Sequence, residues 1–117
     1  MHWRDQKREN WAQHHWGMSY AEYRPLRGGE VVDKFGRQRD QAKRRGIAWE
    51  LTLKEWWKIW QDSGRFSERG RGHGKYVMSR RGDKGPYSVE NVFIQLADKN
   101  TSDALWLTRE RMYAAQQ

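Results

Sequence analysis

The strongest pattern of hydrophobic and polar positions predicts a helix over 53–62. Its large apolar residues recur three or four positions apart: Leu53, Trp56, Trp57 and Trp60. That spacing places side chains on one face of an α-helix. Thr52 and Glu55 have the spacing of a capping box, and Gly64 supplies a stop. We expect the Trp face of this helix to pack into the core.

A second helical pattern covers 31–45. The positions near its inner stripe are Val31, Val32, Phe35, Gln38 and Ala42. The other side carries cations, among them Lys34, Arg37 and Arg44, and Gly46 favours a helix end. A basic helix face is either a solvated surface or a surface that lies along a phosphate backbone, and the pattern leaves both open.

The first 30 residues are less regular. Residues 1–18 favour a short helix through Trp11 to Trp16 or an ordered arm, and Ser19 with Glu22 predicts a short capped helix. Trp3 and Trp11 lie in the least patterned stretch. Because the stretch has no helical pattern that would bury them, we expect them to be the most exposed Trp residues. An exposed Trp among Arg residues can stack on a base.

The C-terminal half predicts a hairpin and a helix. The segment 47–51 favours an edge strand, and 65–75 is rich in Gly and cations, so we expect a loop with no part in the core. Strands are predicted at 76–78 and 91–96, a turn at 83–87, and a helix over 97–117. The result is one α+β domain over 1–117, with an N-terminal arm (1–30), a helical part (31–64) and a ββα hairpin–helix unit (75–117).

The net charge of the chain indicates the class of its binding partner. The 117 residues include 23 Lys and Arg against 15 Asp and Glu, a formal net charge of +8. Such a surplus attracts polyanions, and nucleic acid is the commonest of these. A chain without Cys has no disulfide, thiolate metal site or Cys nucleophile. Because Met1 to Asn10 is charged and no apolar stretch approaches a membrane span, we expect a cytoplasmic protein without a membrane partner.

The segment 76–104 resembles the ββα-metal module of phage HNH endonucleases. Three elements carry the resemblance in order, with Asn100 in the following helix: Met78-Ser79-Arg80, Gly85-Pro86-Tyr87 and Glu90-Asn91-Val92. The resemblance implies a hairpin and a helix that hold one divalent cation against a DNA backbone. In that family a His at the end of the first strand activates water, beside a carboxylate that binds the metal.

This chain departs from the HNH pattern where Ser79 and Arg80 replace the carboxylate and the His. Arg is always protonated and is no base, and Ser is a poor metal ligand. If the chain is active, His73 is the candidate base, and Asp83 with Asn100 would bind Mg²⁺ or Mn²⁺. Otherwise we expect no cofactor, and the motif residues have structural roles: Asp83 in a turn, Tyr87, Asn91 as a brace of the hairpin loop, and Asn100 at the helix start.

We therefore expect a phage or prophage protein that binds nucleic acid, with double-stranded DNA as the leading ligand, through a degenerate HNH-like module. The residues expected to contact phosphate are Arg65, Arg69, Arg71, Lys75, Arg80, Arg81 and Lys84. A metal-dependent endonuclease or nickase is the first alternative. The second is an inhibitor that docks on a host protein complex, such as a CRISPR effector.

Overall fold

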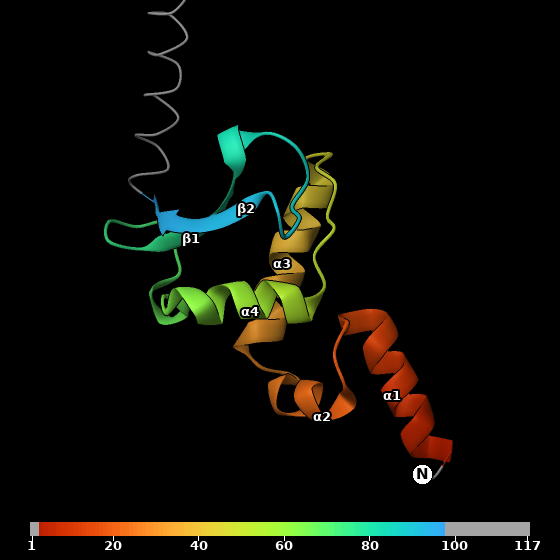
Figure 1. Ribbon diagram of the computed structural model, residues 1–117. Helices are drawn as coiled ribbons and strands as arrows, with labels where there is room; N and C mark the ends of the chain where they lie inside the picture. The colour runs from red at the N-terminus through yellow and green to blue at the C-terminus, as the bar shows by residue number, and fades with distance from the viewer. Residues whose placement is uncertain (1–2, 98–117) are drawn as a thin grey trace, which may run out of the picture.

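The computed structural model describes residues 3–97 and shows an α+β fold (Figure 1). Four helices come first: α1 (Trp3–Trp16), α2 (Tyr20–Tyr23), α3 (Glu30–Arg44) and α4 (Leu53–Ser63). An antiparallel hairpin follows, formed by β1 (Tyr76–Arg80) and β2 (Val92–Leu96). The hairpin lies along α4, α3 crosses α4, and α1 extends away from them. The predicted mixture of helices and a hairpin is confirmed.

Helix α4 forms as its sequence predicts. The Thr52 hydroxyl accepts from the Glu55 amide, and the Glu55 carboxylate accepts from the Thr52 amide, which completes the capping box. Gly64 ends the helix at φ 67°, a left-handed conformation that favours glycine. Trp56 and Trp60 are fully buried and Trp57 is half-buried, so the prediction of a Trp core face is confirmed.

Helix α3 covers this core from the side. It buries Val31, Phe35 and Ala42, three positions of the predicted stripe. The ring of Phe35 meets Trp56 edge-on at 5.7 Å between centroids, and the indole of Trp56 donates to the Gln38 side chain at 2.8 Å. This bond satisfies the buried indole and fixes the rotation of α3, which turns its basic side outward.

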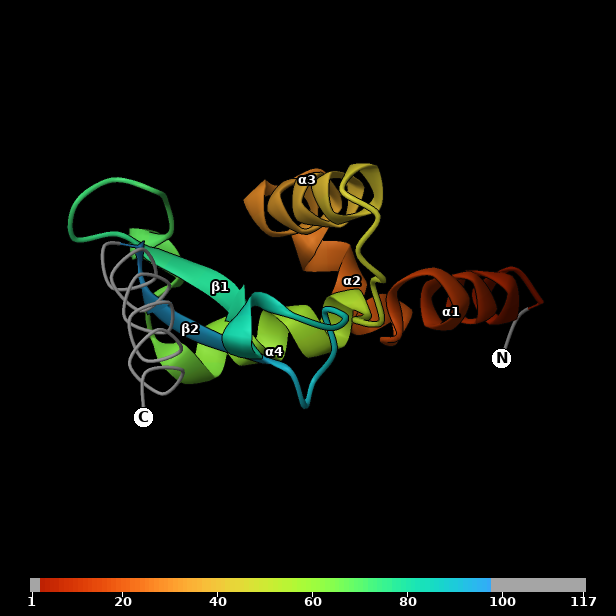
Figure 2. The same cartoon turned by 90° about the horizontal axis from the view of Figure 1, so that it is seen from above.

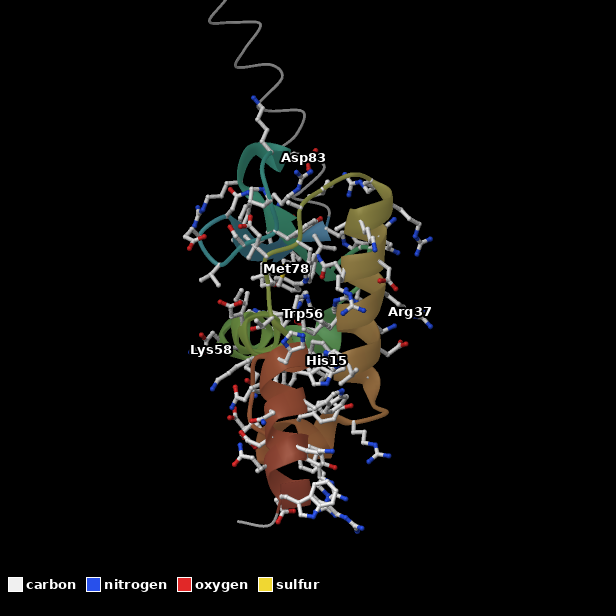
Figure 3. All side chains as sticks on the ribbon, turned by 90° about the vertical axis from the view of Figure 1, so that its right-hand side faces the viewer. His15, Arg37, Trp56, Lys58, Met78 and Asp83 are labelled. Carbon is white, nitrogen blue, oxygen red and sulfur yellow. The ribbon has the colours of Figure 1, made fainter. Side chains whose placement is uncertain are left out.

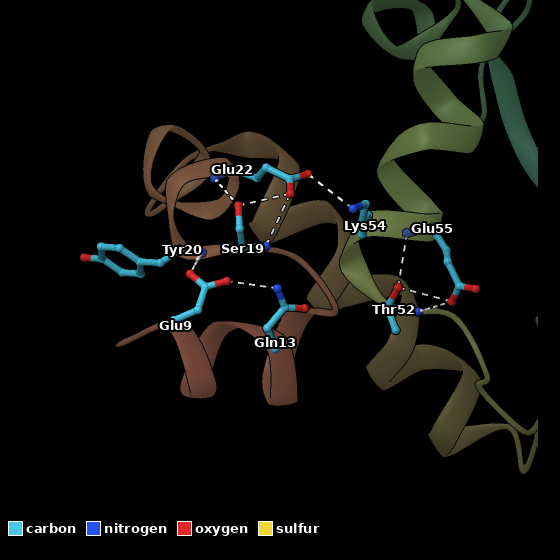
Figure 4. Close-up of polar contacts among 8 residues, drawn as sticks. All are labelled: Glu9, Gln13, Ser19, Tyr20, Glu22, Thr52, Lys54 and Glu55. Carbon is cyan, nitrogen blue, oxygen red and sulfur yellow. Dashed lines mark hydrogen bonds and ion pairs between the residues drawn. The ribbon is translucent and has the colours of Figure 1, made fainter. Parts of the chain in front are cut away.

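The N-terminal prediction was too short, because α1 begins at Trp3 rather than Trp11. Hydrogen bonds four residues apart support it, as between Gln13 and Glu9, and no Gly or Pro interrupts it before Gly17. Glu9 also accepts from the Tyr20 amide, which ties α1 to α2 (Figure 4). The predicted capping box at the start of α2 is confirmed.

Two connecting segments differ from their predictions. Residues 47–51 form no strand of the sheet and make a single parallel bridge, from Trp49 to Tyr87. Residues 65–75 do contribute to the core, because Phe66, in a short 3₁₀ turn, contacts the rings of Trp56, Trp57 and Trp60. The prediction of a loop outside the core followed from the glycine-rich composition of this segment and did not take Phe66 into account.

The hairpin pairs Tyr76 with Leu96 and Arg80 with Val92, so β1 is two residues longer than predicted. Met78 and Val92 are buried against the helices. The terminal helix predicted over 97–117 lies, beyond Ala97, outside the described residues, and so does Asn100. No helix within residues 3–97 is long and apolar enough to cross a membrane.

Candidate nucleic-acid interface

A cleft of about 640 Å³ lies between α3 and the hairpin. Its lining residues come from α3 and from β1, whose ribbons stand apart when the molecule is seen from above (Figure 2). The cations that line it come from three segments: Lys34, Arg37, Arg45, Arg69, Arg71 and Arg80. Among the described residues, one carboxylate, Asp83, also lines it. The cleft is therefore strongly basic.

The wall formed by α3 and its C-terminal cap carries Lys34, Arg37 and the cap residue Arg45, with Gln38 and Gln41 between them. These positions recur at three- or four-residue spacing, so they share one side of the helix. Arg37 pairs with Asp33 at 3.2 Å, and 69% of its side chain is exposed. An exposed ion pair of this kind contributes little, so Arg37 can exchange its partner for a phosphate.

Arg69 lies where the cleft meets the core. Its guanidinium lies 5.6 Å from the ring centroids of both Trp56 and Trp60. Burial lowers the pKa of Arg69, and neighbouring Arg71 lowers it further, against the opposing effect of Glu30. Its Nε has no hydrogen-bond partner within the described residues. Arg69 thus places a cation on an aromatic surface at the edge of the cleft.

The hairpin wall is different, because Arg80 is bound to its own loop. Its guanidinium donates to the Gly85 carbonyl at 2.8 Å and to Asp83 at 3.1 Å, and lies over the ring of Tyr87. Only 8% of the side chain is exposed. Arg80 therefore stabilises the hairpin loop, and the cleft meets a guanidinium whose charge Asp83 already offsets.

Asn91 performs the bracing role that the HNH resemblance implies for it. Its side-chain amide donates to the carbonyls of Lys84 and Pro86, at 2.7 and 2.8 Å. Gly85 lies beneath that amide at φ +77°, and a Cβ there would stand 3.0 Å from the Asn91 nitrogen. Both the left-handed conformation of Gly85 and its close approach to Asn91 favour glycine at this position. The path of the loop thus depends on Asn91.

Tyr87 joins this loop to the helical part of the chain. Its amide donates to the Ala48 carbonyl, and its own carbonyl accepts from the Glu50 amide. The buried ring contacts Trp49, with 5.2 Å between centroids. Tyr87 therefore holds one wall of the cleft at a fixed place relative to α3.

Of the seven predicted phosphate contacts, three line the cleft: Arg69, Arg71 and Arg80. Arg81 folds back on β2, where it donates to the Glu90 carbonyl and lies over Phe93. Arg65 pairs with Glu68 at 2.9 Å. Lys75 and Lys84 are exposed outside the cleft lining.

The sequence prediction did not include Lys34, Arg37 and Arg45 among the binding residues. Their spacing on one helix side was visible in the sequence. Their position beside a hairpin about forty residues later was not, because it depends on how α3 packs on α4.

The described residues do not fit a divalent cation at the position that the HNH resemblance suggests. Ser79 is buried and accepts a hydrogen bond from Gln95 at 3.0 Å. Beside it stands the permanent cation of Arg80, which engages Asp83. Within residues 3–97 no group of three or more His, Cys, Asp or Glu side chains could hold a metal ion.

His73, the candidate base, lies at the wrong end of the strand. It is exposed in the loop before β1, whereas Ser79 and Arg80 lie at the end of β1. The strand from Tyr76 to Arg80 alone spans about 13 Å. His73 is not among the residues that line the cleft.

The cleft thus has one wall with exposed arginines and a half-buried lysine, and one wall whose arginine is bound to the hairpin loop. Between them, Arg69 lies over two Trp rings. No protein-family model, no curated protein and no solved structure matches the chain.

Proposed function

We propose that this chain binds the phosphate backbone of nucleic acid, with duplex DNA as the leading ligand, in the cleft between α3 and the hairpin. The observation that carries the proposal is the charge of the cleft. Cations from α3, from the loop before β1 and from β1 line it, and its carboxylate, Asp83, is already engaged by Arg80. On the α3 wall, phosphate would displace the exposed pair between Arg37 and Asp33, which is a weak contact.

The α3 row is suited to a backbone rather than to one isolated anion. Lys34 and Arg45 are eleven residues apart, which is about 16 Å along a helix axis. Successive phosphates of one DNA strand rise about 3.4 Å each, so the row extends past several of them. Phosphate contacts fix position and carry no sequence information, so binding with little base preference is expected.

The hairpin supports a degenerate HNH-like module. Asn91 braces the loop as the resemblance implies, which supports that relationship, while Ser79 and Arg80 are engaged in bonds within the chain. The module would then bind a nucleic-acid strand in the cleft without cutting it.

The test is binding of a labelled DNA duplex at increasing salt. Each phosphate contacted contributes a slope of about −0.9 to log K against log [salt], so several contacts should give a steep loss of affinity. A flat salt dependence, or no binding at low salt, would contradict the proposal.

Plasmid incubated with the purified protein and Mg²⁺ or Mn²⁺ should stay uncut. Metal-dependent nicking that disappears in His73→Ala, with affinity intact, would replace the binding function with the nuclease alternative.

A further inference from the structure

Helix α1 separates its side chains by chemistry. At 3.6 residues per turn, all its cations and His residues and two of its Trp fall within an arc of about 140°. We term this arc the basic–aromatic face; it consists of Trp3, Arg4, Lys7, Arg8, Trp11, His14 and His15. The remaining arc holds the carboxylates, the amides, Ala12 and Trp16. Both acids of α1, Asp5 and Glu9, thus lie outside the basic–aromatic face.

The second arc holds the buried side of α1, and the basic–aromatic face touches α2 at its edge, where Arg8 lies over the Tyr20 ring and Trp11 meets Tyr23. Ala12 is fully buried, and Glu9 accepts from the Tyr20 amide of α2. All seven residues of the basic–aromatic face are exposed. Trp3 and Trp11 are 58% and 41% exposed, among the most exposed large hydrophobic residues of the described chain. Figure 3 shows ring-bearing side chains, His15 among them, along one side of α1 and oxygen-bearing side chains on the other.

Rings and cations are adjacent on this face. The Lys7 ammonium lies 4.7 Å from the centroid of the Trp3 ring, with Arg4 at 5.7 Å. Trp11 is held in place by edge contacts with His15 and Tyr23, each at 5.2 Å. A ring for a base and a cation for its phosphate thus occur side by side, which is how proteins bind unpaired nucleotides.

The composition of the face distinguishes among ligands. Duplex bases are already stacked on one another, so an indole gains a stacking partner only from an unpaired base. A helix that lies in a membrane surface needs a broad apolar face of Leu, Phe or Trp, and here two Trp are separated by charged residues. Three cations without a carboxylate complement a polyanion.

We infer that the basic–aromatic face of α1 binds unpaired nucleotides of single-stranded nucleic acid, by stacking bases on Trp3 and Trp11. The inference rests on the proposed function, because both sites take the same class of ligand, nucleic acid. The site on α1 is spatially separate, because no residue of α1 lines the cleft. Together the two surfaces fit a nucleic acid that has a duplex part and an unpaired part.

The experiment compares Trp3→Leu and Trp11→Leu with the aromatic controls Trp3→Phe and Trp11→Tyr in the full chain. The ligands are a labelled oligothymidylate and a duplex without overhangs. Each Leu variant should weaken single-strand binding about tenfold, from the loss of one stacked base. The aromatic controls should retain most of the affinity, and duplex binding should not change. Circular dichroism confirms that each variant keeps its helix content.

Leu variants that bind oligothymidylate as tightly as the unaltered chain would overturn the inference. So would an equal loss on both ligands, since the site would then not be separate. Binding to phosphatidylglycerol vesicles that depends on the two Trp, with oligonucleotide binding unchanged, would replace it with a membrane contact. If the chain binds the single strand through these Trp but does not bind duplex, the inference stands and the proposed cleft function fails.

Discussion

The two walls of the cleft use the same residue type in opposite ways. On α3, Arg37 extends into solvent, whereas on the hairpin Arg80 and Arg81 donate to the chain's own carbonyls. Helix carbonyls are already bonded within the helix, so an arginine there finds few acceptors nearby. The irregular hairpin loop leaves carbonyls that need donors, and Arg80 at the end of β1 and Arg81 after it supply them. An arginine is thus available to a ligand where the backbone carbonyls near it already accept hydrogen bonds.

Removing the Arg80 side chain should have the largest effect, and it should be on stability. Arg80→Ala removes two charge-assisted hydrogen bonds and the contact with Tyr87, so the free energy of unfolding should fall by about 2–3 kcal/mol. Arg45→Ala, at the exposed C-terminal cap of α3, should change it by less than about 0.5 kcal/mol. Urea unfolding measures both. An unchanged midpoint for Arg80→Ala with a large loss of duplex affinity would make Arg80 a phosphate contact after all.

These two walls also show what could be predicted from the sequence. Helix α4 was predictable because its capping box, Trp spacing and Gly64 are local features. The brace at Asn91 followed from the HNH resemblance. The role of Arg80 did not, because its acceptor, the Gly85 carbonyl, is placed by a loop whose path depends on Asn91 and Tyr87. Arg69 on two indoles likewise required the tertiary fold.

A smaller effect should follow from removing the charge of Asp83. Its carboxylate is 83% exposed and accepts from Arg80, so it offsets a cation at the cleft. Asp83→Asn should tighten duplex binding severalfold, within the roughly 1 kcal/mol that an exposed ion pair is worth. The gain should disappear when Arg80 is also replaced by Ala. Binding that weakens in Asp83→Asn would show that the carboxylate orients the wall instead of offsetting its charge.

The smallest effect concerns a carboxylate outside the cleft. The Ser19 hydroxyl, and then the Ser19 amide, lower the pKa of Glu22 below its ordinary value of 4.5. The stability that Glu22 gives to α2 is therefore fully present above that value and is lost as the pH falls through the lower folded pKa. Carboxyl NMR titration should show the pKa of Glu22 rising toward 4.5 in Ser19→Ala. A pKa that is the same in both proteins would contradict the capping assignment.

The most direct test of the cleft compares Arg37→Gln with Lys58→Gln. Each change removes one cation from a helix surface, where its side chain is 69% or 70% exposed and pairs with an acid four residues away. Figure 3 shows the two on opposite sides of the molecule. Binding of one duplex across a salt series should give a slope smaller by about 0.9 for Arg37→Gln, with weaker affinity. Lys58→Gln should match the unaltered chain. Equal losses in both variants would mean that overall charge, and not the cleft between α3 and the hairpin, attracts the nucleic acid.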